Sequence, residues 1–253
     1  MRADCHIHID RIGPPHKTPP PTVQDFLIYA RRESINLFCG IYEHERTLQT
    51  FSSIGVPIFP FFWVRTPLLP RIPESARGIK LHPYIENYVL EEGSILPTLQ
   101  IARKRNMPVL VHTDDRKPSL SRGKLVGALA RKFPDIIFVM AHCGSYAPGK
   151  IEIPGASWTN EDLISELVSE GIGVATSCSN VYIEVSILAS KTKARLIAQS
   201  APLEKILLGS DFPIYKPIFG SICFQENALI SEGLSHEQIS SIHANAFRLF
   251  GNR

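Results

Sequence analysis

The sequence predicts an α/β fold in which eight parallel strands alternate with helices and close into one (β/α)8 barrel, a TIM barrel. Three observations lead to this prediction. Short apolar runs recur along the chain, helical patterns separate most of them, and several runs end in a histidine or an aspartate. Residues so far apart in the sequence can meet only if the strands are parallel, because their carboxyl ends then share one face of the barrel.

The expected strands are nearly continuous apolar runs, which is typical of parallel strands that are buried on both faces. They are residues 3–9, 36–42, 57–64, 78–83, 108–113, 136–142, 172–178 and 206–211. An open, doubly wound sheet is the competing architecture. That fold usually has a glycine-rich first turn, whereas the first run here ends in His6-Ile7-His8, so we favour the barrel.

The segments between the strands indicate helices and loops. Apolar residues repeat at helical spacing in residues 125–133 and 163–168, the second after a helix cap at Thr159 or Asn160. Ser235 to Gln238 has the form of a capping box and opens the last helix. Two proline-rich segments, Gly13 to Pro21 and Arg65 to Pro73, are expected as loops that wall or cover the active-site face.

The size and composition favour one soluble globular domain. The chain has 253 residues, 44% of them apolar and 20% charged. A single barrel typically takes about 250 residues, so we expect one domain over residues 1–253. The net charge of +3 is small and no block of lysines and arginines occurs, which excludes an obvious nucleic-acid partner.

The sequence also indicates the compartment. The longest apolar stretches are strand-sized and fall short of the roughly 20 residues that cross a bilayer, so we expect no membrane span. No leader peptide is recognisable before His6. Five scattered cysteines are typical of reduced thiols, and we predict a cytoplasmic protein.

Five potential metal ligands come at the ends of expected strands. His6 and His8 lie on one face of the first strand, because side chains alternate along a strand. His112, His142 and Asp211 end the fifth, sixth and eighth strands. Imidazole nitrogens with a carboxylate suit zinc, manganese, iron or nickel, and an open coordination position could hold water. The set therefore predicts a divalent-metal site at the barrel mouth.

The order of these motifs along the chain resembles the amidohydrolase superfamily. Within it, the chain is similar to the amidohydrolase-related branch, which contains aminocarboxymuconate-semialdehyde decarboxylase-like enzymes. The resemblance covers essentially the whole chain. It rests on Asp-x-His-x-His from Asp4, Gly-Ile-Lys-Leu-His-Pro from Gly78, Val-Leu-Val-His-Thr from Val109, Met-Ala-His-Cys-Gly from Met140, Leu-Gly-Ser-Asp-Phe-Pro from Leu208, and Asn-Ala-Phe-Arg-Leu-Phe from Asn245.

The resemblance implies a ligand set and a catalytic pair. His6, His8, His112 and Asp211 would bind one divalent metal, usually zinc. Such a metal lowers the pKa of water from about 15.7 to about 7 and so supplies hydroxide at neutral pH. Asp211 would accept the proton from this water. His142 would polarise the substrate, help to activate the water, or bind a second metal as in binuclear relatives.

Four further residues are candidates for substrate binding. Lys80 lies on the expected fourth strand, where binuclear relatives carry a bridging group, so a carboxylated lysine is one interpretation. We favour an ammonium that binds an anionic substrate group, while Lys80 or His82 could instead satisfy a buried polar network. Arg65 and Arg116 could clamp a carboxylate through bidentate hydrogen bonds, or could simply face solvent.

The leading functional hypothesis is a metal-dependent hydrolase of a small-molecule amide, ester or lactone, with a metal-bound hydroxide activated by Asp211. The first alternative is non-oxidative decarboxylation of an unsaturated carboxylic acid, because the same branch contains decarboxylases. A metal-independent lactonase and a barrel kept only as a binding protein are the others. No predicted ligand is replaced, which argues against both. The substrate, the metal and a homodimer stay open.

Overall fold

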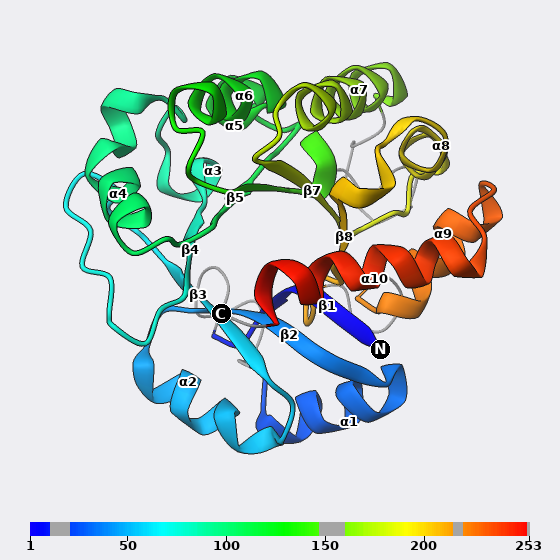
Figure 1. The fold of residues 1–253 in the computed structure, drawn as a ribbon, viewed down its shortest axis with the longest axis horizontal. Coiled ribbons are helices and arrows are strands. Elements are labelled where there is room, and N and C mark those ends of the chain that lie inside the picture. Colours follow the sequence, from blue (N-terminus) through cyan, green and yellow to red (C-terminus); the bar gives the residue numbers. More distant parts are fainter. Residues whose placement is uncertain (11–20, 147–159, 215–219, 252–253) are drawn as a thin grey trace.

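The computed structural model describes residues 1–10, 21–146, 160–214 and 220–251. Eight strands form one parallel sheet in sequence order, and helices surround it (Figure 1). This confirms the predicted (β/α)8 barrel. The strands are β1 (Arg2–His8), β2 (Ile35–Tyr42), β3 (Ile58–Trp63), β4 (Gly78–Leu81), β5 (Val109–His112), β6 (Phe138–Ala141), β7 (Val181–Val185) and β8 (Ile206–Leu208).

Most helices follow a strand and pack on the outside of the barrel (Figure 1). They are α1 (Val23–Glu33), α2 (Glu45–Phe51), α3 (Pro83–Glu86), α4 (Glu92–Lys104), α5 (Pro118–Ser121), α6 (Gly123–Lys132), α7 (Glu161–Ser177), α8 (Lys191–Ser200), α9 (Ile222–Ser231) and α10 (His236–Phe250), with 3-10 turns η1 (Ser52–Ile54), η2 (His142–Gly144) and η3 (Leu203–Lys205). Asn160 caps α7 and a capping box at Ser235 opens α10, as predicted.

Two backbone hydrogen bonds close the barrel between its first and last strands. The amide of His8 donates to the carbonyl oxygen of Phe212 at 2.8 Å, and the amide of Asp211 donates to that of His6 at 2.8 Å. A parallel bridge joins Ile7 to Phe212 at the same place. The closure therefore brings the two ends of the ligand motif, 6–8 and 211, side by side.

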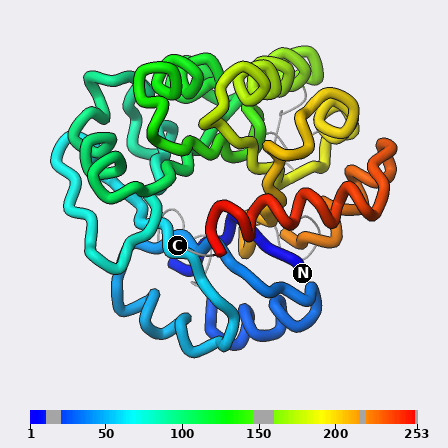
Figure 2. Tube along the Cα trace, viewed as in Figure 1, coloured from blue at the N-terminus to red at the C-terminus, as the bar shows by residue number. Residues whose placement is uncertain are grey.

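One end of the barrel is covered by α10, and we call it the closed end. Ala246, Leu249 and Phe250 of α10 pack in the same cluster as Ala3 and Phe59, which lie near the starts of their strands. Figure 1 shows α10 crossing the barrel, and in Figure 2 the trace of α10 passes next to that of β1, which it contacts. The opposite end, where the strands finish, is the mouth.

The prediction of the seventh strand was wrong. Residues 172–178 belong to the last turns of α7 and its cap, and the strand is instead Val181–Val185. The apolar run misled the interpretation because α7 buries Ile172, Val174 and Ala175 against the barrel, and an apolar run on a buried helix looks like a strand.

The connection between β3 and β4 differs from the expected strand-helix repeat. Residues 64–77, all of them described, contain no helix, which fits the predicted loop from Arg65 to Pro73. The guanidinium of Arg105 compensates for the missing helical hydrogen bonds, since it donates to the carbonyl oxygens of Ile72, Pro73, Glu74 and Ala76.

Some predictions lie outside what the structure describes. Of the predicted loop from Gly13 to Pro21, the structure describes only Pro21. Thr159 also lies outside the described residues. Among the helices in the described residues, none has the length and apolar character needed to cross a membrane. The cytoplasmic location and the homodimer stay predictions.

Candidate metal centre

The predicted ligands lie around the mouth of the barrel. His6 and His8 come from the end of β1, where the pairing with β2 shifts register between Asp4 and Ile7. Such irregularities often re-aim side chains next to functional sites. His112 ends β5, and His142 and Asp211 follow β6 and β8.

Three of these residues meet at one point, and we call them the cation site. Nε2 of His6 lies 3.3 Å from Oδ1 of Asp211, and Nε2 of His8 lies 3.1 Å from the same oxygen. Ligand atoms of all three lie within 4.8 Å of one another, which is close enough for one ion to join them. All three side chains are buried.

Burial sets the protonation of the cation site. It lowers the pKa of His6 and of His8 well below the usual value, and the charge of Lys80 adds to the effect, so both rings are neutral at pH 7. Burial raises the pKa of Asp211, an effect opposed by His6 and Lys80. Oδ2 of Asp211 has no hydrogen-bond partner in the described chain. Neutral imidazoles beside an unsatisfied carboxylate oxygen fit a divalent cation.

Asp4, the first residue of the ligand motif, holds the backbone that carries Asp211. Its carboxylate accepts hydrogen bonds from the amide of Ser210 at 3.0 Å, from the Ser210 hydroxyl at 2.6 Å and from the Tyr29 hydroxyl at 2.7 Å. Asp211 itself is in the left-handed region, with φ of 59°. Residues rarely adopt this conformation without support from their surroundings, and the contacts of Asp4 supply that support.

His112 lies beside the cation site rather than in it. Its Nδ1 is 3.2 Å from Nε2 of His142, and its Nε2 is 2.9 Å from Oδ2 of Asp114. Burial lowers the pKa of His112 to about 4, so the neutral ring carries one proton and can donate to only one of these neighbours. His142 is buried and its Nδ1 lies 2.7 Å from the Ser186 hydroxyl.

Lys80 and His82 both reach this part of the barrel. Nζ of Lys80 lies 3.3 Å from Nε2 of His6, and burial lowers the pKa of this lysine to about 8. The ring of His82 is stacked between Trp63 and His112, at centroid distances of 5.2 and 3.7 Å. Its Nδ1 also accepts a hydrogen bond from the amide of Ile85 at 3.3 Å, so stacking and this bond together hold the ring.

Arg65 and Arg116 are both paired with carboxylates of the protein. Arg65 contacts Glu43 and Glu86 and lies over the ring of Trp63 at 4.0 Å. Arg116 donates from Nε to Asp114 at 2.8 Å. Its guanidinium also lies 3.9 Å from the ring centroid of Tyr84 and 4.7 Å from that of Tyr146. Their positive charge is therefore already balanced where we expected a substrate clamp.

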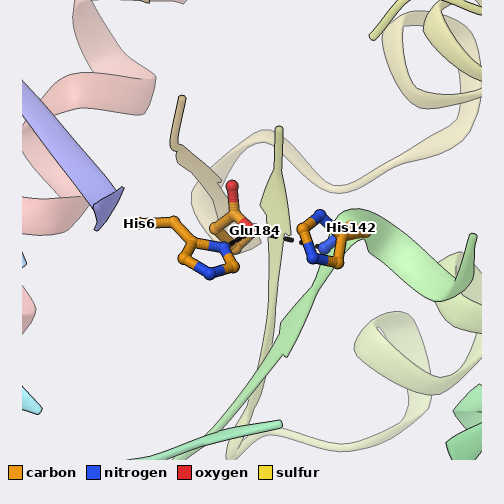
Figure 3. Close-up of side chains that lie close together, drawn as sticks. All are labelled: His6, His142 and Glu184. Atoms are coloured by element: carbon orange, nitrogen blue, oxygen red, sulfur yellow. Dashed lines mark hydrogen bonds and ion pairs between the residues drawn. The ribbon is translucent and has the colours of Figure 1, made fainter. Parts of the chain in front are cut away.

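The structure adds one residue that sequence reasoning missed. Glu184 of β7 is fully buried, and its Oε2 lies 2.8 Å from Nδ1 of His6 (Figure 3). The signal was the alternation in Val181–Val185, whose three aliphatic side chains pack in the outer core while Glu184 contacts site residues inside the barrel. The misplaced strand hid it. Just before β7, the side-chain amide of Asn180 donates to the carbonyl oxygens of Ala130, Phe133 and Ile136.

Comparison with protein families identifies the chain. The family model described as Amidohydrolase matches residues 71–251. The chain belongs to the amidohydrolase family. This confirms the resemblance that the motifs predicted. No curated protein matches the sequence.

Solved amidohydrolase structures share the fold. A probable 2-pyrone-4,6-dicarboxylic acid hydrolase from Acinetobacter baumannii, solved with citric acid, has a TM-score of 0.67 at 16% identity, over 99% of both chains. An amidohydrolase from Burkholderia multivorans with bound zinc has a TM-score of 0.68 at 13% identity, also over 99% of both chains. A 5-carboxyvanillate decarboxylase from Sphingomonas paucimobilis has a TM-score of 0.57 at 13% identity, over 92% of this chain and 84% of its own.

These comparisons establish the family of the chain, and with it a general type of function. Membership of the family supports a metal-dependent enzyme. The similar structures include both a hydrolase and a decarboxylase, so the likeness does not distinguish the two reactions. At such low identities, structural likeness shows the fold alone.

Proposed function

We propose that this protein is a metal-dependent hydrolase that cleaves an amide, ester or lactone bond of a small molecule. The convergence of His6 and His8 on Asp211, whose second oxygen has no partner among the described residues, carries the proposal. These three residues would hold one divalent cation, most simply zinc. His112 is proposed as a fourth ligand from the family resemblance.

A cation bound there would lower the pKa of water to about 7 and so supply a nucleophile at neutral pH. Asp211 has the role of proton acceptor, because its pKa is raised by burial and its Oδ2 is unoccupied by other donors of the described chain. The ammonium of Lys80, which is buried 3.3 Å from His6, stabilises negative charge that develops on the carbonyl oxygen. His142 polarises the same carbonyl group.

Decarboxylation of an unsaturated acid is the second candidate. It needs a cationic group to hold the substrate carboxylate, and the buried Lys80 ammonium is the described residue that suits this role. The pairing of Arg65 and Arg116 with protein carboxylates favours hydrolysis of an uncharged bond instead.

The test is the metal content of protein purified without chelators or a metal-binding tag, measured by plasma mass spectrometry. We expect about one zinc or manganese ion per chain, and loss of this ion in Asp211→Ala and His8→Ala. Lactones, esters, amides and unsaturated carboxylates would then be screened. Near two ions per chain would instead make His142 and a carboxylated Lys80 ligands of a second metal. A protein that cannot be loaded with metal would overturn the proposal.

A further inference from the structure

We propose that Glu184 is a positioning residue: it fixes the ring proton of His6 on Nδ1 and so directs the Nε2 lone pair of His6 at the cation site. The proposal deepens the proposed function and rests on it for the identity of the bound group. The first part of the proposal, the position of the His6 ring proton, concerns the protein alone and can be tested without any cation.

Glu184 sits between two site histidines, as Figure 3 shows. Its Oε2 accepts a hydrogen bond from Nδ1 of His6 at 2.8 Å and from the backbone amide of His142 at 3.2 Å. The hydroxyl of Ser186 donates to the same oxygen at 3.1 Å. All four side chains are buried, so water does not compete for these bonds.

The neighbours of His6 agree on one tautomer. The backbone amide of His142 can only donate, so Oε2 of Glu184 acts as an acceptor, and it accepts from His6 Nδ1 as well. On the other side of the ring, Nζ of Lys80 lies 3.3 Å from Nε2, and an ammonium can only donate. Both contacts place the ring proton on Nδ1 and leave Nε2 with a lone pair.

In this tautomer, the unprotonated Nε2 of His6 is the nitrogen that lies at the cation site. The lone pair of His6 Nε2 lies 3.3 Å from Oδ1 of Asp211, which also carries lone pairs. Two such atoms repel each other unless a positive group lies near both. A carboxylate on the far nitrogen of a metal-binding imidazole fixes the ring orientation and makes the ligand nitrogen more basic, and loss of such a partner typically weakens metal binding about 10- to 100-fold.

Residue 209 is a glycine, and the absence of a side chain there leaves space for the Glu184 carboxylate. A Cβ atom on Gly209 would lie 2.2 Å from Oε1 of Glu184 and 2.8 Å from Cβ of His6. Any other residue there would push Glu184 away from His6. Gly209, which precedes Ser210 and Asp211 after β8, is therefore explained by the contact between Glu184 and His6 rather than by its own backbone conformation.

The first experiment determines the tautomer in metal-free protein. Histidine is labelled with 15N, bound metal is removed with a chelator, and long-range 1H–15N spectra of the full chain are recorded, with His6→Asn to assign the ring. We expect Nδ1 of His6 protonated and Nε2 bare, and we expect Glu184→Leu to shift the proton or mix the tautomers. A wild-type His6 protonated on Nε2 would overturn the proposal.

The second experiment measures the affinity for Zn2+ and Co2+ by competition with a coloured chelator. Glu184→Gln keeps the shape of the side chain and should bind both ions more weakly, and Glu184→Leu should lose about 10- to 100-fold. The matched control is Glu226→Gln. Glu226 is also a buried glutamate that contacts a histidine ring, His243, at 2.7 Å, but it lies at the closed end.

The outcomes separate the possible roles. Weaker binding in the Glu184 variants but not in Glu226→Gln supports the proposal. Equal losses in both would mean general destabilisation and would overturn it, as would two bound ions of which the Glu184 variants lose one, since Glu184 would then be a ligand. If no form binds an ion, the proposed function fails, while the tautomer spectra still decide whether Glu184 positions His6.

Discussion

The barrel contains a buried glutamate-histidine pair at each end, and the two pairs differ in how completely their partners are satisfied. At the closed end, Glu226 accepts from His243 at 2.7 Å and from Arg2 at 2.7 Å, and the other nitrogen of His243 accepts from the amide of Ala3 at 3.2 Å. At the mouth, Glu184 contacts His6 through Oε2, while its Oε1 has no partner in the described chain.

This difference distinguishes a structural network from a site. Donors and acceptors match around Glu226, so its pair joins α9, α10 and β1 without needing another group. At the mouth, by contrast, two buried carboxylate oxygens, Oε1 of Glu184 and Oδ2 of Asp211, have no hydrogen-bond partner in the described chain. Buried polar atoms are rarely left unsatisfied, so these two oxygens fit a site that binds a cation.

The largest effect is expected at the mouth. Asp211→Asn removes the negative charge that would hold the cation and accept the proton, so the rate constant on any substrate found should fall by about 10²- to 10⁴-fold. The measurement is kcat/KM with equal amounts of folded protein, verified by circular dichroism. Activity close to that of the wild type would exclude Asp211 from catalysis.

At the closed end, the expected loss is in stability. Glu226→Ala leaves His243 and Arg2 without their shared partner and should lower the free energy of unfolding by about 3 kcal/mol. Urea denaturation followed by fluorescence measures this loss. Metal content per folded chain should not change, and a variant that lost its metal would show that the two ends are coupled.

A smaller effect concerns pH and His112. Its pKa in the folded protein is about 4, below the usual 6.5, because burial disfavours the charged ring. Its neutral form thus contributes stability above pH 6.5 that is lost as the pH falls toward 4. Between pH 7 and pH 5 the wild type should lose about 2 kcal/mol more than His112→Gln. Parallel urea curves at the two pH values test this, and equal losses would contradict it.

The smallest effect is expected far from the mouth. The Ser235 side chain accepts from the amide of Gln238 and caps α10. Ser235→Ala should cost about 1 kcal/mol of stability through this helix end, with no change in metal affinity. Thermal unfolding and the chelator competition together check both parts. Weaker metal binding in this variant would mean that α10 does more than close the barrel.

The sequence predicted the barrel well because seven of the expected strands are apolar runs that coincide with strands of the structure, with helical patterns between most of them. It failed where burial makes a helix and a strand look alike: residues 172–178 end α7, and β7 begins at Val181. The same error hid Glu184, because a charged residue is expected to be exposed to solvent unless its buried partners are known. Its partners are the His6 ring of β1, 178 residues away, and the His142 amide after the neighbouring β6, 42 residues away.

The candidate site was predictable only as a set of residue types at strand ends. That His6, His8 and Asp211 meet follows from parallel strands closing into a barrel. Which side chains are already engaged does not follow, because pairs such as Arg65 with Glu86 depend on loop conformation. For the same reason the sequence could not show that His112 turns toward Asp114 and His142 in this structure.

The closure of the barrel determines when, during synthesis of the chain, the site can form. His6 and His8 are made well before Asp211, and Asp4 and Ser210, which join β1 to the segment after β8, are 206 residues apart. A ribosome-bound chain that stops before β8 thus carries two of the three cation-site residues and cannot form the backbone hydrogen bonds that close the barrel. We therefore expect the barrel to close, and the proposed activity to begin, only when β8 docks against β1.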